Sequence, residues 1–274
     1  MTKPDPDSPV YTFLSDLQPP ILKALERAIA VEESAPNPGD QTLSSLTEMA
    51  GTAMAAGEFE TAKALYSAAR AIRRDDHLVH RLALATYKSG VPDPVSALRA
   101  ARDIVRDLNP GVSNDPETLG LWGAVHKRLW QATSERASLD TAIRAYERGF
   151  DIRTDHYNGI NLAFLLNERA KVSDPAEQIA DFVNAERVRR RVMPLCHAIL
   201  EDPASGDGQR YWAAATLAEA HLGIGDVVGG EEWLAKANAI PATDWMRKST
   251  TDQLAQLKDL LEPSPLAMIR PPGQ

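Results

Sequence analysis

The sequence predicts an all-α protein built from stacked helix-turn-helix pairs. Apolar residues recur with helical spacing from about Pro19 to Leu261, and segments of alternating polar and apolar residues with strand length are missing. In addition, small and large apolar residues alternate regularly within residues 115–167. A helix pair with this alternation cannot bury its apolar face alone, so it must stack on similar neighbours.

That segment holds one complete helix pair and the first helix of the next. Its first helix carries the large-small pair Trp122-Gly123, and its second carries Ala142, Tyr146 and Gly149. Small residues let paired helices approach closely, and the large residue of one helix fills the space they leave. The residues expected in the core between neighbouring units are Trp122, Ala142, Tyr146, Gly149, Leu162 and Leu165.

The alternation repeats along the chain. From Ala62 to Ala97 is 35 residues and from Ala97 to Ala142 is 45 residues. Tetratricopeptide repeats recur every ~34 residues, so the spacing fits that repeat with loop insertions. The predicted fold is a tetratricopeptide-like, right-handed helical solenoid of about five helix pairs with a leading and a capping helix.

The expected elements follow in chain order. A leading helix begins at Pro19-Pro20 and ends near Glu33, because proline in a first turn lacks only an N–H that has no intrahelical partner. A linker at 34–40 precedes the helix pairs. The pairs are expected at 41–56 with 58–74, 77–89 with 93–108, 115–132 with 136–151, 156–170 with 175–201, and 208–223 with 227–239. A closing helix at 244–262 carries one leucine stripe: Leu254, Leu257, Leu260 and Leu261.

The expected organisation is one domain with two terminal segments. Residues 1–18 are expected to be mostly disordered, because the first nine carry three prolines. Residues 19–262 form a single solenoid domain, and 263–274 form a flexible, proline-rich tail. Leu266, Met268 and Ile269 give that tail apolar residues that could dock on a partner.

The amino-acid composition argues against several classes of function. The chain is 43% hydrophobic and 25% charged, as in ordinary globular proteins. Its net charge of −8 argues against nucleic-acid binding, which needs lysine and arginine to neutralise phosphates. No apolar run approaches the ~18 residues of a membrane span, and the N-terminus has no secretory pattern. With a single cysteine, Cys196, these features predict a cytoplasmic protein without a disulfide framework.

Known catalytic motifs are missing, so we expect neither enzyme activity nor a cofactor. His77 and His80 have ligand-compatible spacing but no third ligand nearby, which favours a structural or exposed pair over a metal site. Cys196 beside His197 on an apolar helix is expected to be a buried structural residue. The glycine-rich run 223–230 follows no strand, so it is interpreted as a turn rather than a phosphate cradle.

One cluster of positive charge stands out. It comprises Arg187, Arg189, Arg190 and Arg191. On a helix these side chains spread over more than half the circumference, which favours a solvated face paired with nearby acids. A docking patch for an acidic ligand is the alternative.

Three runs of sequence resemble a known regulatory domain. They are Trp122-Gly123-Ala124-Val125-His126-Lys127, Ala142-Ile143 with Tyr146-Glu147-Arg148-Gly149-Phe150, and Tyr157-Asn158-Gly159-Ile160-Asn161-Leu162-Ala163-Phe164-Leu165-Leu166. Over about 55 residues they resemble the TRAF-binding domain of the apoptosis signal-regulating kinases. The chain lacks the kinase motifs themselves.

The resemblance implies a tetratricopeptide-like fold and a regulatory binding role, without naming the partner. Related modules occur in bacterial signalling and conflict systems, and the composition, rich in alanine, arginine and aspartate, suits a high-GC bacterium. We therefore expect a regulatory protein of such a system rather than a ligand of a eukaryotic TRAF protein.

Tyr157, Asn158 and Asn161 are candidate binding residues. They lie at the start of a first-in-pair helix, and such helices line the concave face of a tetratricopeptide superhelix. Their spacing predicts that the three share a face. An asparagine side chain both donates and accepts, which suits recognition of a peptide backbone. The alternative is structural: the asparagines bond to a neighbouring repeat and the tyrosine fills a gap between repeats.

Lys127, Arg128 and Arg148 are candidates for positive charge in the same region, with simple solvation as the alternative. Two functions follow. The first is a non-catalytic interaction or regulatory module that binds a protein partner or effector on its concave face. The second is a sensor that binds a small anionic or nucleotide-like ligand in the same groove. Metal, membrane and nucleic acid are not expected partners.

Overall fold

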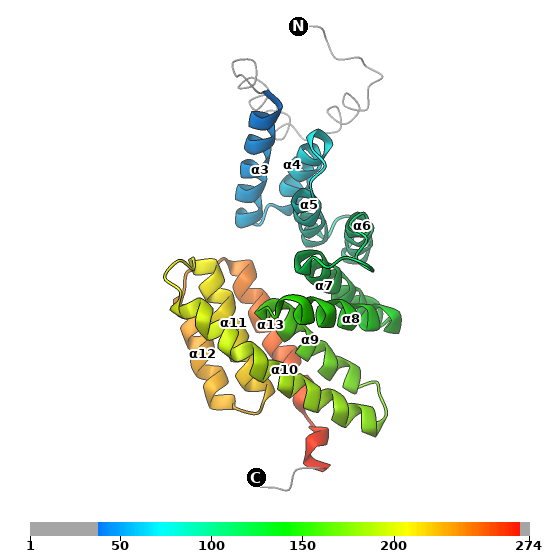
Figure 1. The fold of residues 1–274 in the computed structure, drawn as a ribbon, viewed down its shortest axis with the longest axis vertical. Coiled ribbons are helices and arrows are strands. Elements are labelled where there is room, and N and C mark those ends of the chain that lie inside the picture. The colour runs from blue at the N-terminus through cyan, green and yellow to red at the C-terminus, as the bar shows by residue number, and fades with distance from the viewer. Residues whose placement is uncertain (1–37, 269–274) are drawn as a thin grey trace. The chain divides into compact units, whose positions relative to one another are not determined.

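The computed structural model describes residues 38–268, which contain helices and no strand (Figure 1). The α-helices are α3 (Pro38–Ala56), α4 (Phe59–Ile72), α5 (Asp76–Ser89), α6 (Pro94–Arg106), α7 (Pro116–Thr133), α8 (Arg136–Arg153), α9 (His156–Ala170), α10 (Pro175–Glu201), α11 (Asp207–Gly223), α12 (Val227–Ala239) and α13 (Asp244–Leu261). The predicted helix pairs and closing helix are confirmed. The expected leading helix at 19–33 and the segment 1–18 lie outside the described residues.

Aspartates start most of these helices. The side chain of Asp75 accepts from two backbone N–H groups at the start of α5. Later helices are capped by aspartates that accept one or two such bonds: Asp93, Asp115, Asp155 and Asp174. Proline occupies the first turn of α6, α7 and α10. Capping by a carboxylate satisfies N–H groups that have no partner within the helix, which explains why the helices begin at these residues.

The chain divides into two compact units between Leu108 and Asn109. In the first unit, α3 packs on α4, α4 on α5, and α5 on α6. Leu46, Leu65 and Tyr66 are buried in its core beside the small residues Ala50 and Ala62. This is the small-large alternation expected of the repeats. The single 19–262 domain stays a prediction.

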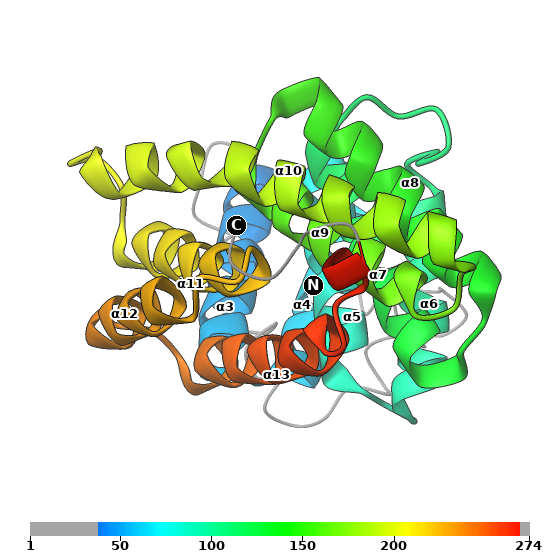
Figure 2. The ribbon, with the colours of Figure 1, turned by 90° about the horizontal axis from the view of Figure 1, so that it is seen from below.

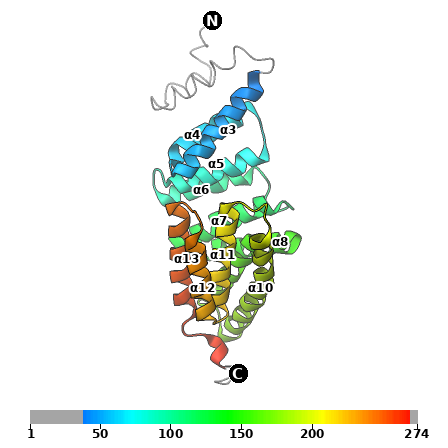
Figure 3. The same ribbon diagram turned by 90° about the vertical axis from the view of Figure 1, so that its left-hand side faces the viewer.

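The second unit contains α7 to α13. Consecutive helices pack as the pairs α7 with α8, α9 with α10, and α11 with α12. Both α9 and α11 contact α10 on one side and α13 on the other (Figure 2). Figure 3 shows α11, α12 and α13 with roughly aligned axes. The closing helix therefore lies across the first helices of two earlier pairs.

Close helix contacts in the second unit rely on glycine. A Cβ atom at Gly123 would lie 2.8 Å from the ring of Tyr146, and one at Gly149 would lie 2.8 Å from the side chain of Asn158. Tyr146 is completely buried between these helices, as predicted, whereas Trp122 is half-buried and packs edge-on against His126. The other expected core residues, Ala142, Leu162 and Leu165, are buried.

Part of the expected flexible tail is ordered. Pro265–Met268 forms a short 3₁₀ helix, η1, after α13. Leu266 is 7% exposed and packs in one cluster with Ala170 and Phe182. Burial of this leucine stabilises the contact, while the flexibility of the tail stays a prediction.

None of the helices in the described range 38–268 is long and apolar enough to span a membrane.

Candidate functional site

A buried lysine joins three helices of the second unit. The side chain of Lys127 on α7 is 6% exposed. Its ammonium group donates to the side-chain oxygen of Asn161 on α9 at 2.9 Å and to that of Gln253 on α13 at 2.8 Å. The same nitrogen lies 4.2 Å from the ring centroid of Phe164, a cation–π contact. Lys127 and Asn161, both predicted site residues, thus meet.

The hydrogen bonds of Lys127 extend through Gln253 to a fourth helix, α11. The amide nitrogen of Gln253 donates to the carboxylate of Glu219 on α11 at 3.1 Å, and Glu219 is itself 7% exposed. Asn161, Lys127, Gln253 and Glu219 therefore form one chain of hydrogen bonds across α9, α7, α13 and α11. We call these four residues the polar chain. Glu219 and Gln253 were not among the predicted site residues, because nothing in sequence spacing relates them to Lys127.

Burial dominates the electrostatics of the polar chain. Burial lowers the pKa of Lys127 to about 7, although the carboxylate of Glu219 opposes this shift. Arg128 lowers that pKa further, while Glu168 raises it. Burial raises the pKa of Glu219, against the influence of Lys127 and Arg189. Removing the two charges from water carries a cost that their indirect contact through Gln253 offsets only in part.

The helix α13 covers the face on which Lys127 and Glu219 lie. Leu254, Leu257 and Leu260 are buried in the main core cluster of this unit, and Leu257 is completely inaccessible. Two polar contacts flank the stripe. The amide of Gln131 on α7 donates to Gln256 at 2.8 Å, and the hydroxyl of Tyr211 on α11 donates to Thr250 at 2.9 Å. We call the surface of α7, α9 and α11 under α13 the inner face.

Asn158 and Asn161 contact different groups. Asn158 is 2% exposed and donates from its amide nitrogen to Asp155 at 2.7 Å. Its side chain fills the space beside Gly149. Asn161 is half-buried and donates to the backbone carbonyl of Tyr157 at 2.9 Å. Asn158 also lies beside Gly120 on α7 and donates to the carbonyl of Pro116 at 3.4 Å, as the structural alternative expects. A common binding face for the three residues stays a prediction.

Tyr157 lies at the edge of this region. Its side chain is 46% exposed, and its ring packs edge-on against Tyr146 with 6.0 Å between centroids. It also covers Gly120 on α7, where an added Cβ atom would come within 3.1 Å of the ring. One side of the ring therefore packs on α7 and α8, and the rest remains exposed.

The two predicted arginines point to separate places. The guanidinium of Arg128 donates to the carbonyl of Ala124 in its own helix at 3.2 Å. Arg148 donates to the carbonyl of Gly111 at 3.0 Å and to the side chain of Asn114 at 2.8 Å. Arg148 thus bonds to the loop that precedes α7, and its charge does not lie beside Lys127.

The arginine cluster on α10 is not one solvated face. Arg189 is completely buried and donates to the side-chain oxygen of Asn167 at 2.7 Å and to the carbonyl of Gly223 at 3.1 Å. Arg191 lies over the ring of Phe150, with 4.5 Å between its guanidinium carbon and the centroid. The solvated interpretation is wrong for Arg189, because its side chain extends between α9 and α11 where a carbonyl and an amide oxygen are available.

Cys196 is completely buried, and burial raises the pKa of its thiol to about 12. The predicted burial of this cysteine is therefore confirmed. Between Pro38 and Met268, no three histidine, cysteine, aspartate or glutamate side chains gather as a metal site.

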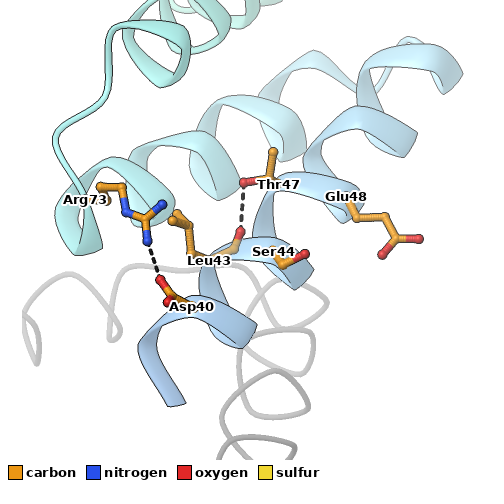
Figure 4. A pocket seen from close by; sticks show the side chains of 6 residues that line it. All are labelled: Asp40, Leu43, Ser44, Thr47, Glu48 and Arg73. Atoms are coloured by element: carbon orange, nitrogen blue, oxygen red, sulfur yellow. Dashed lines mark hydrogen bonds and ion pairs between the residues drawn. The ribbon is translucent and has the colours of Figure 1, made fainter. Parts of the chain in front are cut away.

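An open hollow of about 580 Å³ lies on the first unit (Figure 4). Its lining comprises Asp40, Leu43, Ser44, Thr47, Glu48 and Arg73. Arg73 forms an ion pair with Asp40 at its edge, and the hydroxyl of Thr47 donates to the carbonyl of Leu43 at 2.7 Å. Asp40, Arg73 and Thr47 thus bond within the lining, rather than converge on the hollow as groups that bind a ligand usually do.

Residues 58–166 match a family described as Tetratricopeptide Repeats-Sensor. No curated protein matches the chain in sequence.

Three solved structures align with the chain, one of them with a TM-score above 0.5. A thermophilic tetratricopeptide protein of Thermus thermophilus, TTC0263, is 14% identical, aligns with 78% of this chain and 99% of its own, and has a TM-score of 0.54. BtubC of P. vanneervenii, at 13% identity, aligns over 85% of this chain and 91% of its own with a TM-score of 0.44. Yeast Tom70, at 13% identity, aligns over 91% of this chain and 50% of its own with a TM-score of 0.43. The alignment with TTC0263 shows that the helix pairs of this chain have the tetratricopeptide-repeat fold.

Proposed function

We propose that the chain is a non-catalytic interaction and regulatory module that binds a helical segment of a protein partner on the inner face. One observation carries this proposal: the inner face already holds a helix, α13, through buried leucines and side-chain hydrogen bonds. The tetratricopeptide fold suits such a role, because stacked helix pairs create extended binding surfaces.

Three of the predicted site residues belong to the binding surface under this proposal. Lys127 and Asn161 provide the polar contact, and Tyr157 provides an exposed aromatic side chain at the edge. Aromatic residues are enriched among the side chains that dominate binding energy. Arg128 lies on the same helix as Lys127, while Asn158 and Arg148 support the fold around the site.

The setting is also part of the proposal. The resemblance to the regulatory domain of the apoptosis signal-regulating kinases, and the sensor family that matches residues 58–166, both support a signalling role. We place the protein in the cytoplasm of a bacterium, in a signalling or conflict system, where it regulates a partner effector.

Site-specific photocrosslinking in the native host tests where partners bind. A benzoylphenylalanine residue replaces Tyr157 in one variant and Val227 at the start of α12 in the other. The two native side chains are similarly exposed, at 46% and 50%. We expect a discrete protein adduct from position 157 that Lys127→Ala abolishes. Equal adducts from both positions, or an adduct from position 227 alone, would contradict the proposal.

A second candidate function is a sensor for a small anionic or nucleotide-like ligand. It is favoured by the sensor description of the matching family and by the buried ammonium group of Lys127. That nitrogen already donates to Asn161 and Gln253, so an anionic ligand has to replace Gln253 to reach it. Calorimetric titration with ATP and with pyrophosphate tests this candidate. Saturable binding that Lys127→Met removes would favour the sensor, and no heat with either ligand would count against it.

A further inference from the structure

The leucine stripe and amides of α13 match the inner face of the second unit. Leu254, Leu257 and Leu260 recur every three residues and enter the core cluster that α9 and α11 share. Gln253 lies beside the stripe and contacts Lys127 and Glu219 at once. An amide can do this because its oxygen accepts from the ammonium group while its nitrogen donates to the carboxylate. The inner face therefore selects an amphipathic helix with a glutamine at one position.

Covering the inner face with α13 costs free energy, because it buries two charged side chains. Under α13, Lys127 and Glu219 are 6% and 7% exposed, yet no direct ion pair joins them. If α13 leaves, both charges regain water, which offsets part of the apolar burial that α13 provides. Apolar residues at these two positions would hold α13 more tightly, so the buried charges favour a contact that can open.

Besides its contacts with the inner face, α13 is attached at both ends. At its start, the guanidinium of Arg247 donates to the carbonyls of Asn238 and Ile240 at 3.2 and 2.9 Å, which ties the first turn to the end of α12. Beyond its end, Leu266 of η1 packs on Ala170 and Phe182. If Leu266 and the inner-face contacts are released together, the bonds of Arg247 still tie the first turn to α12 and would act as a hinge.

We infer that α13 is a displaceable occupant of the inner face, and that a partner binds by exchanging for α13 an amphipathic helix with leucines at three-residue spacing and a glutamine opposite Lys127. This inference rests on the proposed function and adds the kind of partner and the step that precedes its binding. It makes the closing helix an internal competitor that lowers the apparent affinity of every partner.

A peptide with the sequence of residues 244–261 is the probe for this exchange. The receptor is the full chain with Gln131→Cys and Gln256→Cys, two exposed positions whose native side chains bond across α7 and α13. In one preparation a short bis-maleimide joins the cysteines and fixes α13 in place. In the matched control, N-ethylmaleimide caps both. The native Cys196 is completely buried, so the reagents modify the introduced thiols selectively.

Fluorescence anisotropy of the labelled peptide reports binding. We expect saturable binding to the capped receptor, and at least tenfold weaker binding to the cross-linked one. A control peptide with serine at the three leucine positions should bind neither. Equal binding to both receptors would show that the peptide attaches elsewhere, and no binding to the capped receptor at ~1 mM peptide would show that α13 does not exchange. Either result overturns the inference, provided that circular dichroism shows both receptors to be helical.

The outcomes separate this inference from the proposed function. If position 157 captures a partner but the peptide does not exchange, the partner binds beside a fixed α13 and only the inference fails. If the peptide exchanges but position 157 captures no partner, the face opens as inferred while the proposed function fails.

Discussion

The ammonium nitrogen of Lys127 and the side-chain oxygen of Gln253 lie 2.8 Å apart, although 126 residues separate them in the sequence. This hydrogen bond joins the first helix of the second unit to its closing helix. Gln253 also donates to Glu219, so one glutamine serves two buried charges of opposite sign. Much of the chemistry of the inner face therefore depends on this single side chain.

Replacement of Gln253 should loosen the closing helix. Gln253→Ala removes a hydrogen-bond partner from both Lys127 and Glu219, and a buried group left without its partner costs ~1–3 kcal/mol. Gln256→Ala is the control, because Gln256 lies on the same helix but is exposed. Urea denaturation should show a clear loss of unfolding free energy for the first variant and a change within ~0.5 kcal/mol for the second. Similar losses in both variants would argue against a special role for the polar chain.

Raising the pH should stabilise the wild type relative to Lys127→Met. Burial lowers the pKa of Lys127 in the folded protein to about 7, from an ordinary value of 10.5. Between these values the unfolded chain binds more protons at this site than the folded one, so the unfolding free energy rises with pH. Below pH 7 the lysine is protonated in both states, so this gain in unfolding free energy is lost.

Urea denaturation at pH 8 and pH 10 measures the unfolding free energy of both proteins. Groups that titrate equally in the two proteins cancel when one free energy is subtracted from the other. Arg128, Glu168 and Glu219 act on this lysine, and the carboxylates are ionised throughout that window in the unfolded chain. A difference between the two proteins that stays constant from pH 8 to pH 10 would show that Lys127 is not desolvated as described.

Gly149→Leu should overpack the contact between α8 and α9. Even a Cβ atom at this position lies 2.8 Å from the side chain of Asn158, which is itself fixed by Asp155. We expect a loss of ~1–3 kcal/mol in unfolding free energy. Gly208→Ala in α11 is the control, since a Cβ atom there meets nothing within 4 Å. A neutral Gly149→Leu variant would mean that the two helices separate easily.

Arg189 should be indispensable to the second unit, in contrast to its neighbour Arg187. Arg189→Ala removes a buried guanidinium that satisfies Asn167 and the carbonyl of Gly223, and we expect a loss of ~3 kcal/mol or more. Arg187 is exposed, so Arg187→Ala should change stability by less than ~0.5 kcal/mol. Thermal unfolding of the two variants compares them directly, and equal midpoints would refute the assigned burial.

The helices were predictable because local signals mark them. Aspartates such as Asp115 and Asp155 cap their starts, and Gly57 and Gly225, with φ angles of +78° and +88°, turn the chain after α3 and α11. These signals act within a few residues, so sequence spacing reveals them. The packing of Tyr146 against Gly123 follows from the same repeat pattern.

The candidate site was predictable only in part. The resemblance and the helix positions singled out Lys127 and Asn161, which do meet. The leucine stripe of α13 shows that the helix buries one side, but not which surface receives it, so Gln253 and Glu219 stayed hidden. The packing of Asn158 beside Gly149 and Gly120 likewise depends on how α7, α8 and α9 meet, which its spacing from Asn161 does not reveal. Docking of distant segments depends on tertiary geometry that no local pattern encodes.

Site-resolved hydrogen exchange of the backbone amides tests the central claim most directly, because it measures the opening of α13 in the unmodified protein. We predict that the amides of Leu254 and Leu257 exchange through a local opening of α13, with a lower free energy and a smaller urea dependence than those of Leu162 and Leu165 in α9. If both helices exchange with the same free energy and the same urea dependence, α13 opens only when the second unit unfolds, and the account of a displaceable closing helix is wrong.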